Sequence, residues 1–454
     1  MTRRNRMLTQ EQNDRLTQVG PGTPMGELMR RYWIPIRPYA QLLDEKVMAV
    51  RILGEDLVLF RAKNGDLGLV GEFCPHRMAK LKYGFPDEDG LRCCYHGWKF
   101  DGTGQCTDTP METPGGTFKD NIKITGYPVK ELGGLVWAYM GPSPTPLLPP
   151  WSLLVFPNAL RQIGIAELDC NWLQCHENTG DPTHSAYLHG HYFKFLLEQE
   201  GKLDERASDE EAHTLYGRIK LEKGIESLWV NSTEYGMEKG INYSRALGAD
   251  RDYKSRHSTV IFPFYTQTGG PTRPRQEFQI RVPIDDTHTY HINYGCYLAP
   301  PQVHVPVQEV IPWYNVPLFD DAGKPLLDFV LAQDAHAWIS QGPITDRTKE
   351  QLGRTDIPIV FMRRQLEEQM AIVEDGGEPM NVFRDPDRMP DLIHGGLWDE
   401  KDSAVIGIRT GVSNYRAAYH KGYGIDDADR YGPAMPLVVE MMQKIEELER
   451  AEVD

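Results

Sequence analysis

The chain has 454 residues, of which 40% are hydrophobic and 25% charged, a composition typical of a globular protein with room for two domains. Its net charge of −16 argues against nucleic acid and anionic membranes as partners. No stretch approaches the roughly 18 apolar residues of a membrane span, and the basic start lacks the apolar run of a signal peptide. We therefore expect a cytoplasmic protein.

The N-terminal part of the sequence predicts helices followed by strands. One short helix covers roughly residues 9–18, and a second opens at Thr23-Pro24, a favourable N-cap and first-turn pair. From Val47 the hydrophobic period changes to that of strands, with a turn at residues 64–66. These strands lead into the first of two loops that contain Cys and His.

The two loops read C-P-H at residues 74–76 and C-C-Y-H at residues 93–96. A zinc site of two Cys and two His usually groups like ligands together, as C-x₂₋₄-C and H-x₃₋₅-H. Here each loop supplies both a Cys and a His, which suits a two-iron cluster with two thiolates on one iron and two imidazoles on the other. We therefore predict a Rieske-type [2Fe-2S] centre, with Gly97 allowing a tight turn and Trp98 shielding it.

The second loop offers two thiols. Cys93 gives C-x-x-H and Cys94 gives C-x-H. This segment resembles Rieske proteins, whose second loop reads C-x-x-H, and the resemblance favours Cys93. The predicted cluster ligands are thus Cys74, His76, Cys93 and His96, and Cys94 is expected to be a small buried residue. An odd total of seven cysteines predicts no disulfide framework, and we expect reduced core thiols at Cys106, Cys170, Cys175 and Cys296.

A proline-rich stretch at residues 141–151 marks the best domain boundary. We expect N-terminal helices in residues 1–36 that pack on the catalytic domain, a Rieske domain in 37–145, and a catalytic domain with a helical C-terminal extension in 146–454. The C-terminal helix predicted at 436–450 has an apolar stripe that could face its own domain or a neighbouring trimer. Its members are Leu437, Met441, Ile445 and Leu448.

A second group of candidate ligands lies beyond that boundary. On a helix, Asp181 and His184 would share a face, whereas His189 requires the helix to tighten or end nearby. Two His and one carboxylate form the facial triad of non-haem ferrous oxygenases. Asp181 could equally contact a ligand His without binding the metal itself. His176 and His191 compete by residue type, and His176 falls on a different helix face.

Three motifs together resemble the large (alpha) subunit of a Rieske non-haem iron aromatic-ring-hydroxylating oxygenase, of the phthalate-dioxygenase-like group. They are the two cluster loops, N-W-L-Q-x-x-E-N-x-x-D-P-T-H-x-x-x-L-H at residues 171–189, and a stretch at 333–364 that begins with Q-D-A-H-A-W and ends in a helix containing R-R. The similarity runs from about Met7 to the low 370s. It implies an α+β fold: a small all-β Rieske domain, and a larger catalytic domain whose antiparallel sheet is flanked by helices in a helix-grip arrangement.

The resemblance also implies roles for individual residues. His184, His189 and Asp334 would bind a mononuclear Fe(II), which takes O₂ as co-substrate. Asp181 would be the catalytic bridge, hydrogen-bonded to His184 and to the cluster ligand His96 of a neighbouring subunit. Such proteins are head-to-tail homotrimers, or hexamers of two stacked trimers.

Other polar residues near these motifs have alternative interpretations. Asn178, one turn before Asp181, would line the same site or form a local hydrogen bond. Asp328, Asp346 and Glu350 compete with Asp334 by residue type, and we expect Asp346 to pair with the adjacent Arg347.

The resemblance implies the terminal oxygenase component of a multicomponent enzyme that hydroxylates or O-demethylates an aromatic acid in aromatic hydrocarbon catabolism. The sequence lacks the G-x-G-x-x-G fingerprint of a dinucleotide site, so electrons would come from a separate NAD(P)H-dependent reductase with flavin and an iron-sulfur centre. The alternatives are a strict ring cis-dihydroxylating dioxygenase, and a Rieske electron carrier without oxygenase activity.

Candidate substrate residues lie in the strand-like part of the catalytic domain. Arg245 and Arg256 could bind the carboxylate of an aromatic acid, or could be ordinary surface residues. Phe262, Phe264 and Tyr265 could form the wall of an aromatic pocket, or could belong to the sheet core.

Overall fold

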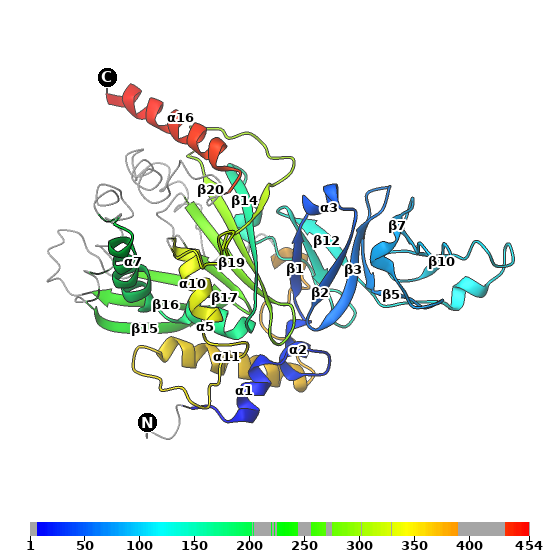
Figure 1. Ribbon diagram of the computed structural model, residues 1–454, viewed down its shortest axis with the longest axis horizontal. Helices are drawn as coiled ribbons and strands as arrows, with labels where there is room; N and C mark the ends of the chain where they lie inside the picture. The colour runs from blue at the N-terminus through cyan, green and yellow to red at the C-terminus, as the bar shows by residue number, and fades with distance from the viewer. Residues whose placement is uncertain are drawn as a thin grey trace.

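The computed structural model describes residues 7–201, 203, 219, 222, 225–243, 256–268, 275–300, 302–327, 329–388 and 432–453. A small β-rich lobe extends from a larger domain in which helices cover a broad sheet (Figure 1). The predicted fold class, α+β with an all-β lobe and a larger mixed domain, is confirmed. Among the described helices, none combines the length and hydrophobicity needed to cross a membrane.

The N-terminal helices form where the sequence predicts them. Helix α1 (Gln10–Thr17) begins after Thr9, whose side chain forms a reciprocal capping box with Gln12. Helix α2 (Pro24–Met29) is capped by Thr23. Helix α1 lies beside α11 (Ile357–Glu374), and Arg15 forms ion pairs with Glu367 and Glu374 on that helix.

The small lobe is built from short antiparallel sheets. The first has the order β11-β4-β3-β2 and the second β10-β9-β8-β7; β5 pairs with β6, and β1-β13-β12 joins the lobe to the rest. The strands are β1 (Trp33–Pro38), β2 (Val47–Ile52), β3 (Glu55–Arg61), β4 (Leu67–Gly71), β5 (Phe73–Cys74), β6 (Ala79–Lys80), β7 (Phe85–Pro86), β8 (Leu91–Arg92), β9 (Lys99–Phe100), β10 (Cys106–Asp108), β11 (Gly126–Tyr127), β12 (Val129–Leu132) and β13 (Leu135–Tyr139).

The larger domain contains an eight-stranded sheet with the order β15-β16-β17-β18-β19-β20-β14-β21. All neighbours are antiparallel, as predicted, except that β21 runs parallel to β14. The strands are β14 (Ala159–Leu168), β15 (Ile225–Thr233), β16 (Gly236–Tyr243), β17 (Arg256–Ile261), β18 (Tyr265–Thr268), β19 (Arg275–Pro283), β20 (Thr289–Leu298) and β21 (Trp313–Asn315).

The two faces of this sheet differ in polarity. Alternate residues such as Ile280 and Ile292 pair in register and join the apolar core that continues into the small lobe. On the opposite face, Arg281 pairs with His291, and both lie against Trp338. The helices over this polar face include α5 (Trp172–Gly180), α6 (His184–Ala186), the π-helix η4 (Tyr187–Tyr192), α7 (Phe193–Gln199) and α10 (Val330–Ile339) (Figure 1).

Helix α16 (Met435–Val453) packs on its own domain. Val438, Met441, Met442 and Ile445 are buried in the main core, and the Tyr297 hydroxyl donates to the Met435 sulfur. The buried stripe is therefore rotated from the predicted one, because Leu437 and Leu448 are only partly buried. Shorter helical segments are α3 (Gln41–Asp44), α4 (Ser152–Val155), η2 (Leu81–Tyr83), η3 (Phe118–Asn121) and η6 (Pro386–Arg388).

Candidate cluster site and metal centre

The two Cys/His loops lie side by side in the small lobe. The first follows β5, whose Cys74 pairs with Ala79 of β6. The second connects β8 to β9 and is closed by a hydrogen bond from the Cys93 amide to the Trp98 carbonyl. Gly97 sits in that loop with a φ of +75°, a conformation that side chains disfavour, as expected for a tight turn.

The four predicted ligands lie on the two neighbouring loops, where the two imidazoles are close to each other and the two thiols are close to each other. Cys74 and Cys93 are both 2% exposed, and the rings of His76 and His96 are 4.3 Å apart. Trp98 stacks on His76 at 4.5 Å, and the Nδ1 atom of His76 is buried without a hydrogen-bond partner in the described chain. Burial raises the pKa of the Cys74 thiol to about 12, so a metal would have to displace its proton. Two buried thiols facing two imidazoles, one with an unsatisfied nitrogen, fit a two-iron cluster.

Cys94 does not match our expectation of a buried residue. The thiol is exposed, whereas that of Cys93 is buried. The side chains of adjacent residues point in different directions, so only one of the two thiols can face the interior of the loop pair. The position of Cys93 beside Cys74 makes it the better ligand candidate.

The segment that carries the two His candidates is not one continuous helix. Helix α5 ends at Gly180, and Asp181 is its C-cap with extended backbone. The chain resumes as α6, begun by His184, and then widens into the π-helix η4. We expected a helix that carries Asp181 and His184 on one face and that tightens or ends near His189; instead the helix breaks at Asp181 and widens through His189. The wider turn of the π-helix, with its i to i+5 hydrogen bonds, brings His189 to the same side as His184, five residues earlier.

His184, His189 and Asp334 form a compact group, although Asp334 lies far along the chain on α10. One candidate ligand atom from each lies within 4.8 Å of the others. The Nε2 atoms of His189 and His184 lie 3.1 and 3.7 Å from the Asp334 Oδ1 atom. Two imidazoles and one carboxylate directed at a common point can bind a divalent cation and leave other coordination positions open.

The electrostatics of this group suit a metal. Burial raises the pKa of the Asp334 carboxyl, but His189 and His184 outweigh burial, and its pKa falls to about 2. Burial lowers the pKa of His184. At neutral pH the site therefore has an ionised carboxylate beside a neutral imidazole, the protonation states in which both groups ligate.

The outer nitrogens of both imidazoles are occupied by acceptors. The Nδ1 atom of His184 lies 2.8 Å from the backbone carbonyl of Asp181, and that of His189 lies 2.8 Å from Oε1 of Gln333. Both Nε2 atoms are thereby directed toward Asp334. Gln333 was not predicted as a site residue, although its position immediately before Asp334 in the Q-D-A-H-A-W motif was an available signal.

Asp181 and Asn178 flank the group. The Oδ1 atom of Asp181 accepts from the Thr183 amide at 2.7 Å, and Oδ2 lies 3.7 Å from Nδ1 of His184. About a quarter of the Asp181 side chain is exposed. The Asn178 amide donates to Oδ1 of Asp334 at 3.4 Å, so its contact in the structure is with a candidate ligand.

A buried ion-pair cluster connects α5 to α11 and to the segment before α11. Glu177 pairs with both Arg347 and Arg363, and Arg363 also binds Glu350. Asp346 instead forms an ion pair with Lys349, so our expected pairing of Asp346 with Arg347 was wrong. The Arg347 side chain points into the protein, where its buried guanidinium is paired with the buried carboxylate of Glu177.

The remaining candidates lie elsewhere. His176 is buried against Trp172, and His191 hydrogen-bonds Glu222 at 2.8 Å. Arg245 and Asp328 are outside the described residues, and Arg256 begins β17 with a side chain that is not described.

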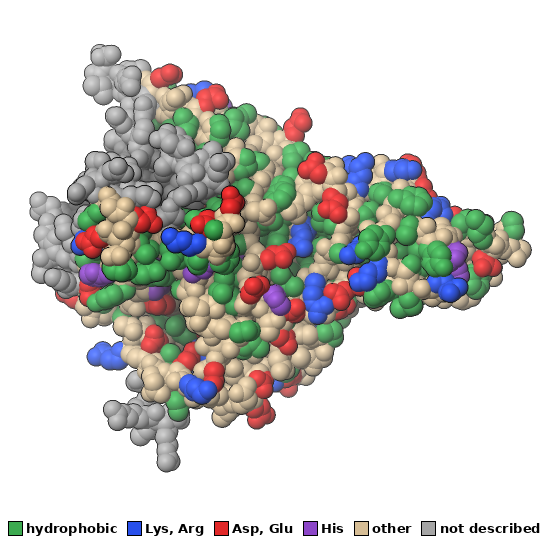
Figure 2. Space-filling model, in the orientation of Figure 1, with side chains coloured by type: hydrophobic (Ala, Val, Ile, Leu, Met, Phe, Trp, Pro, Cys, Tyr) green, Lys and Arg blue, Asp and Glu red, His purple; other side chains and the backbone are tan. Residues whose placement is uncertain are grey.

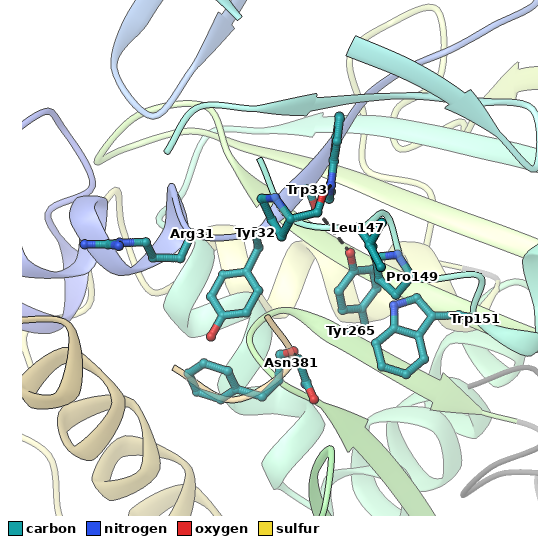
Figure 3. Close-up of a pocket in the computed structure, with 10 residues that line it drawn as sticks. Arg31, Tyr32, Trp33, Leu147, Pro149, Trp151, Tyr265 and Asn381 are labelled. Atoms are coloured by element: carbon teal, nitrogen blue, oxygen red, sulfur yellow. Dashed lines mark hydrogen bonds between the residues drawn. The ribbon is translucent and has the colours of Figure 1, made fainter. Parts of the chain in front are cut away.

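Phe262, Phe264 and Tyr265 are buried in the main core. Phe262 and Tyr265 also line a cavity of about 20 Å³ where the small lobe meets the larger domain, together with Arg31, Tyr32, Trp33, Pro146, Leu147, Pro149, Trp151 and Asn381 (Figure 3). This volume admits about one water molecule. The cavity is therefore too small to be the binding site of an aromatic acid.

Comparisons with known proteins match both parts of the chain. The Rieske [2Fe-2S] domain family matches residues 32–128. The chain is 40% identical over 387 residues to the 5,5'-dehydrodivanillate O-demethylase oxygenase subunit of a Sphingobium species, and the match covers 84% of each chain. It is 31% identical over 401 residues to the phthalate 4,5-dioxygenase oxygenase subunit of Pseudomonas putida, covering 82% of this chain and 88% of that one.

A solved structure shares the fold. NdmA of Pseudomonas putida CBB5 with caffeine superimposes with a TM-score of 0.56, covering 83% of this chain and 97% of that chain at 18% identity. The likeness extends over both the small lobe and the larger domain, since so much of each chain is covered.

Proposed function

The chain belongs to the Rieske non-haem iron oxygenases, as an oxygenase subunit of the phthalate-dioxygenase-like group, and we propose that it oxidises an aromatic acid at a mononuclear iron site formed by His184, His189 and Asp334. The observation that carries the proposal is the convergence of both Nε2 atoms on Asp334 in a chain that also has a Rieske domain. A Rieske electron carrier would need only the small lobe.

Cys74, His76, Cys93 and His96 are the proposed cluster ligands. The burial of both thiols and the unsatisfied Nδ1 atom of His76 support this assignment. When bound, the cluster would store single electrons and the mononuclear iron would bind and activate O₂. Trp98, stacked on His76, would limit access of water to the imidazole side.

We propose that electrons cross between subunits of a head-to-tail trimer. The cluster loops belong to the protruding lobe, whereas α5 and α10 lie in the larger domain, away from that lobe (Figure 1). Both regions expose apolar side chains, which supports a contact between copies. They are Met78, Tyr83, Phe85, Tyr95 and Phe118 near the cluster, and Tyr187, Tyr192 and Phe195 near the iron site.

Figure 2 shows hydrophobic side chains spread over the surface of the protruding lobe, interspersed with basic ones. A heterologous contact of this lobe with the next subunit closes as a ring. In that ring the partly exposed Asp181 carboxylate would accept a hydrogen bond from His96 of the neighbouring subunit. The Asp181 carbonyl would meanwhile keep His184 oriented.

The relatives are named as oxygenase subunits, so electrons come to this chain from another component. We propose a separate NAD(P)H-dependent reductase with flavin and an iron-sulfur centre. The reductase would dock near the small lobe in order to reach the cluster.

The proposed substrate is an aromatic carboxylate. Support comes from two relatives whose names contain aromatic carboxylates, dehydrodivanillate and phthalate. Arg245 and Arg256 remain the proposed anchors, because a guanidinium matches a carboxylate in a bidentate pair. The higher identity to the O-demethylase favours O-demethylation, and the similarity to the phthalate enzyme keeps ring dihydroxylation as the second candidate.

A substrate screen tests this proposal. Purified protein with a surrogate reductase and NADH should consume O₂ when methoxylated aromatic acids are added, with one formaldehyde released per turnover. A cis-diol without formaldehyde would identify the dioxygenase alternative. If no aromatic carboxylate stimulates O₂ uptake above that of its uncharged amide, the proposed substrate class is wrong.

A further inference from the structure

Gln333 precedes the proposed ligand Asp334 on α10 but contacts the opposite ligand of the site. Its Oε1 atom lies 2.8 Å from Nδ1 of His189, and its Nε2 atom donates a 2.7 Å hydrogen bond to the backbone carbonyl of Leu327. Gln333 is 1% exposed and His189 is 3% exposed, so water does not compete for these bonds. We propose that Gln333 is a positioning residue that fixes the tautomer of His189 and thereby sets the metal affinity of the site.

The contact with Leu327 fixes the orientation of the Gln333 amide. A backbone carbonyl can only accept hydrogen bonds, so the Leu327 carbonyl must face the NH₂ group of that amide. The amide oxygen is then the atom that faces His189. Because this oxygen also can only accept, the Nδ1 atom of His189 must carry a proton. A neutral imidazole has one such proton, so its lone pair lies on Nε2, 3.1 Å from Asp334.

The two imidazoles of the site are held in different ways. The Nδ1 atom of His184 contacts the backbone carbonyl of Asp181, which no substitution removes. The Nδ1 atom of His189 contacts a side chain, so this contact can be removed by substituting one residue. Removing the hydrogen-bond acceptor of the other ring nitrogen of a ligand imidazole typically lowers metal affinity by about 10- to 100-fold.

The inference rests on the proposed metal site, and it can be tested by metal binding without turnover. We would remove the mononuclear iron with a chelator, retain the cluster, and titrate the protein with Co²⁺ by its visible ligand-field bands. Gln333→Met keeps the side-chain length but removes both hydrogen bonds. We expect its Co²⁺ dissociation constant to rise by about 10- to 100-fold with an unchanged cluster spectrum.

Gln333→Glu restores an acceptor for His189. We expect its Co²⁺ affinity to recover most of the loss seen in Gln333→Met, because the carboxylate accepts from Nδ1. His336 provides a matched control on the same helix. Its Nε2 atom lies 2.8 Å from the Leu318 carbonyl, an equivalent link from α10 to the preceding segment. His336→Met should lower the melting temperature while the Co²⁺ affinity stays at the wild-type value.

Three results would overturn the inference: wild-type affinity in Gln333→Met, no recovery in Gln333→Glu, or an equal loss in His336→Met. If Gln333→Met fails to assemble its cluster, Gln333→Asn replaces it, since the shorter amide cannot reach both partners, and wild-type affinity there would also overturn it. His189→Ala separates the two proposals. Wild-type Co²⁺ binding in His189→Ala would mean that the proposed metal site is wrong. If His189→Ala loses Co²⁺ binding but Gln333→Met binds Co²⁺ normally, only the proposed role of Gln333 is wrong.

Discussion

The backbone carbonyl of Asp181, and not its carboxylate, makes the close contact with the imidazole ring of His184. The carbonyl oxygen lies 2.8 Å from Nδ1 of His184, whereas the nearest carboxylate oxygen to that nitrogen is 3.7 Å away. One carboxylate oxygen accepts hydrogen bonds from the amide and hydroxyl of Thr183 and from the backbone amide of His184, in the turn after α5. The backbone carbonyl of Asp181 therefore orients His184, whereas the side chain carries the negative charge. A substitution can remove the charge without removing the contact that orients His184.

Asp181→Asn should keep both metal centres filled but slow electron transfer from the cluster to the mononuclear iron. The asparagine carbonyl oxygen can still accept from Thr183, and the backbone contact to His184 is unchanged. The amide is a weaker acceptor for the imidazole of a neighbouring subunit, so we expect substrate oxidation to fall about 100-fold. Rapid mixing should show a cluster that the reductase reduces normally but that reoxidises slowly with substrate and O₂. Reoxidation at the wild-type rate would exclude Asp181 as the bridge.

The two adjacent cysteines of the second cluster loop should behave differently. Cys93→Ser removes a buried thiol beside Cys74, and we expect loss of the red-brown colour and of the electron-resonance signal of a two-His, two-Cys cluster. Cys94→Ser alters an exposed side chain and should leave both signals intact. Bleaching by Cys94→Ser alone would reverse the ligand assignment.

The buried Glu177 should contribute strongly to stability. Burial raises its pKa, but Arg347 and Arg363 outweigh burial and hold the pKa below its ordinary value. Glu177→Gln leaves two buried guanidinium groups without this carboxylate, and we expect a loss of about 3–5 kcal/mol at neutral pH. Glu367→Gln removes a half-exposed partner of Arg15 and should cost at most about 1 kcal/mol.

The same cluster predicts a pH dependence. A folded pKa below the unfolded one gives stability that is present above the unfolded pKa and is lost as the pH falls through the folded value. The difference in melting temperature between wild type and Glu177→Gln should therefore be largest near neutral pH and shrink below the ordinary range of a glutamate. A difference that stays constant down to acidic pH would contradict the proposed role of the ionised carboxylate.

Local patterns in the sequence predicted local structure well. Helix α1 and the Thr23 cap of α2 form as expected, and so do the strands before the first loop and the tight turn at Gly97, because each depends on neighbouring residues. The π-helix was missed because its widened turn has no clear signature in residue type. The exposure of Cys94 was missed for a similar reason, since spacing does not show which of two adjacent side chains points inward.

Contacts between distant segments were also not predicted from the sequence. Gln333 meets His189 across 144 residues, and Arg347 meets Glu177 across 170. Sequence proximity favoured Asp346 as the partner of Arg347, but the neighbouring side chain points to solvent and pairs with Lys349. Only the folded arrangement of α5, α10 and α11 decides which buried charge meets which partner.

Mixed trimers test the central claim, that a cluster in one subunit serves the iron site of the next. One chain would carry Cys93→Ser, which removes the cluster, and the other Asp334→Ala, which removes the mononuclear iron. Each variant alone should be inactive. Co-expressed with different tags and purified through both, the mixed trimers should regain substrate-dependent O₂ uptake and product formation, since an intact cluster can face an intact iron site. Mixed trimers as inactive as either variant alone, beside active wild-type trimers carrying the same two tags, would contradict electron transfer between subunits.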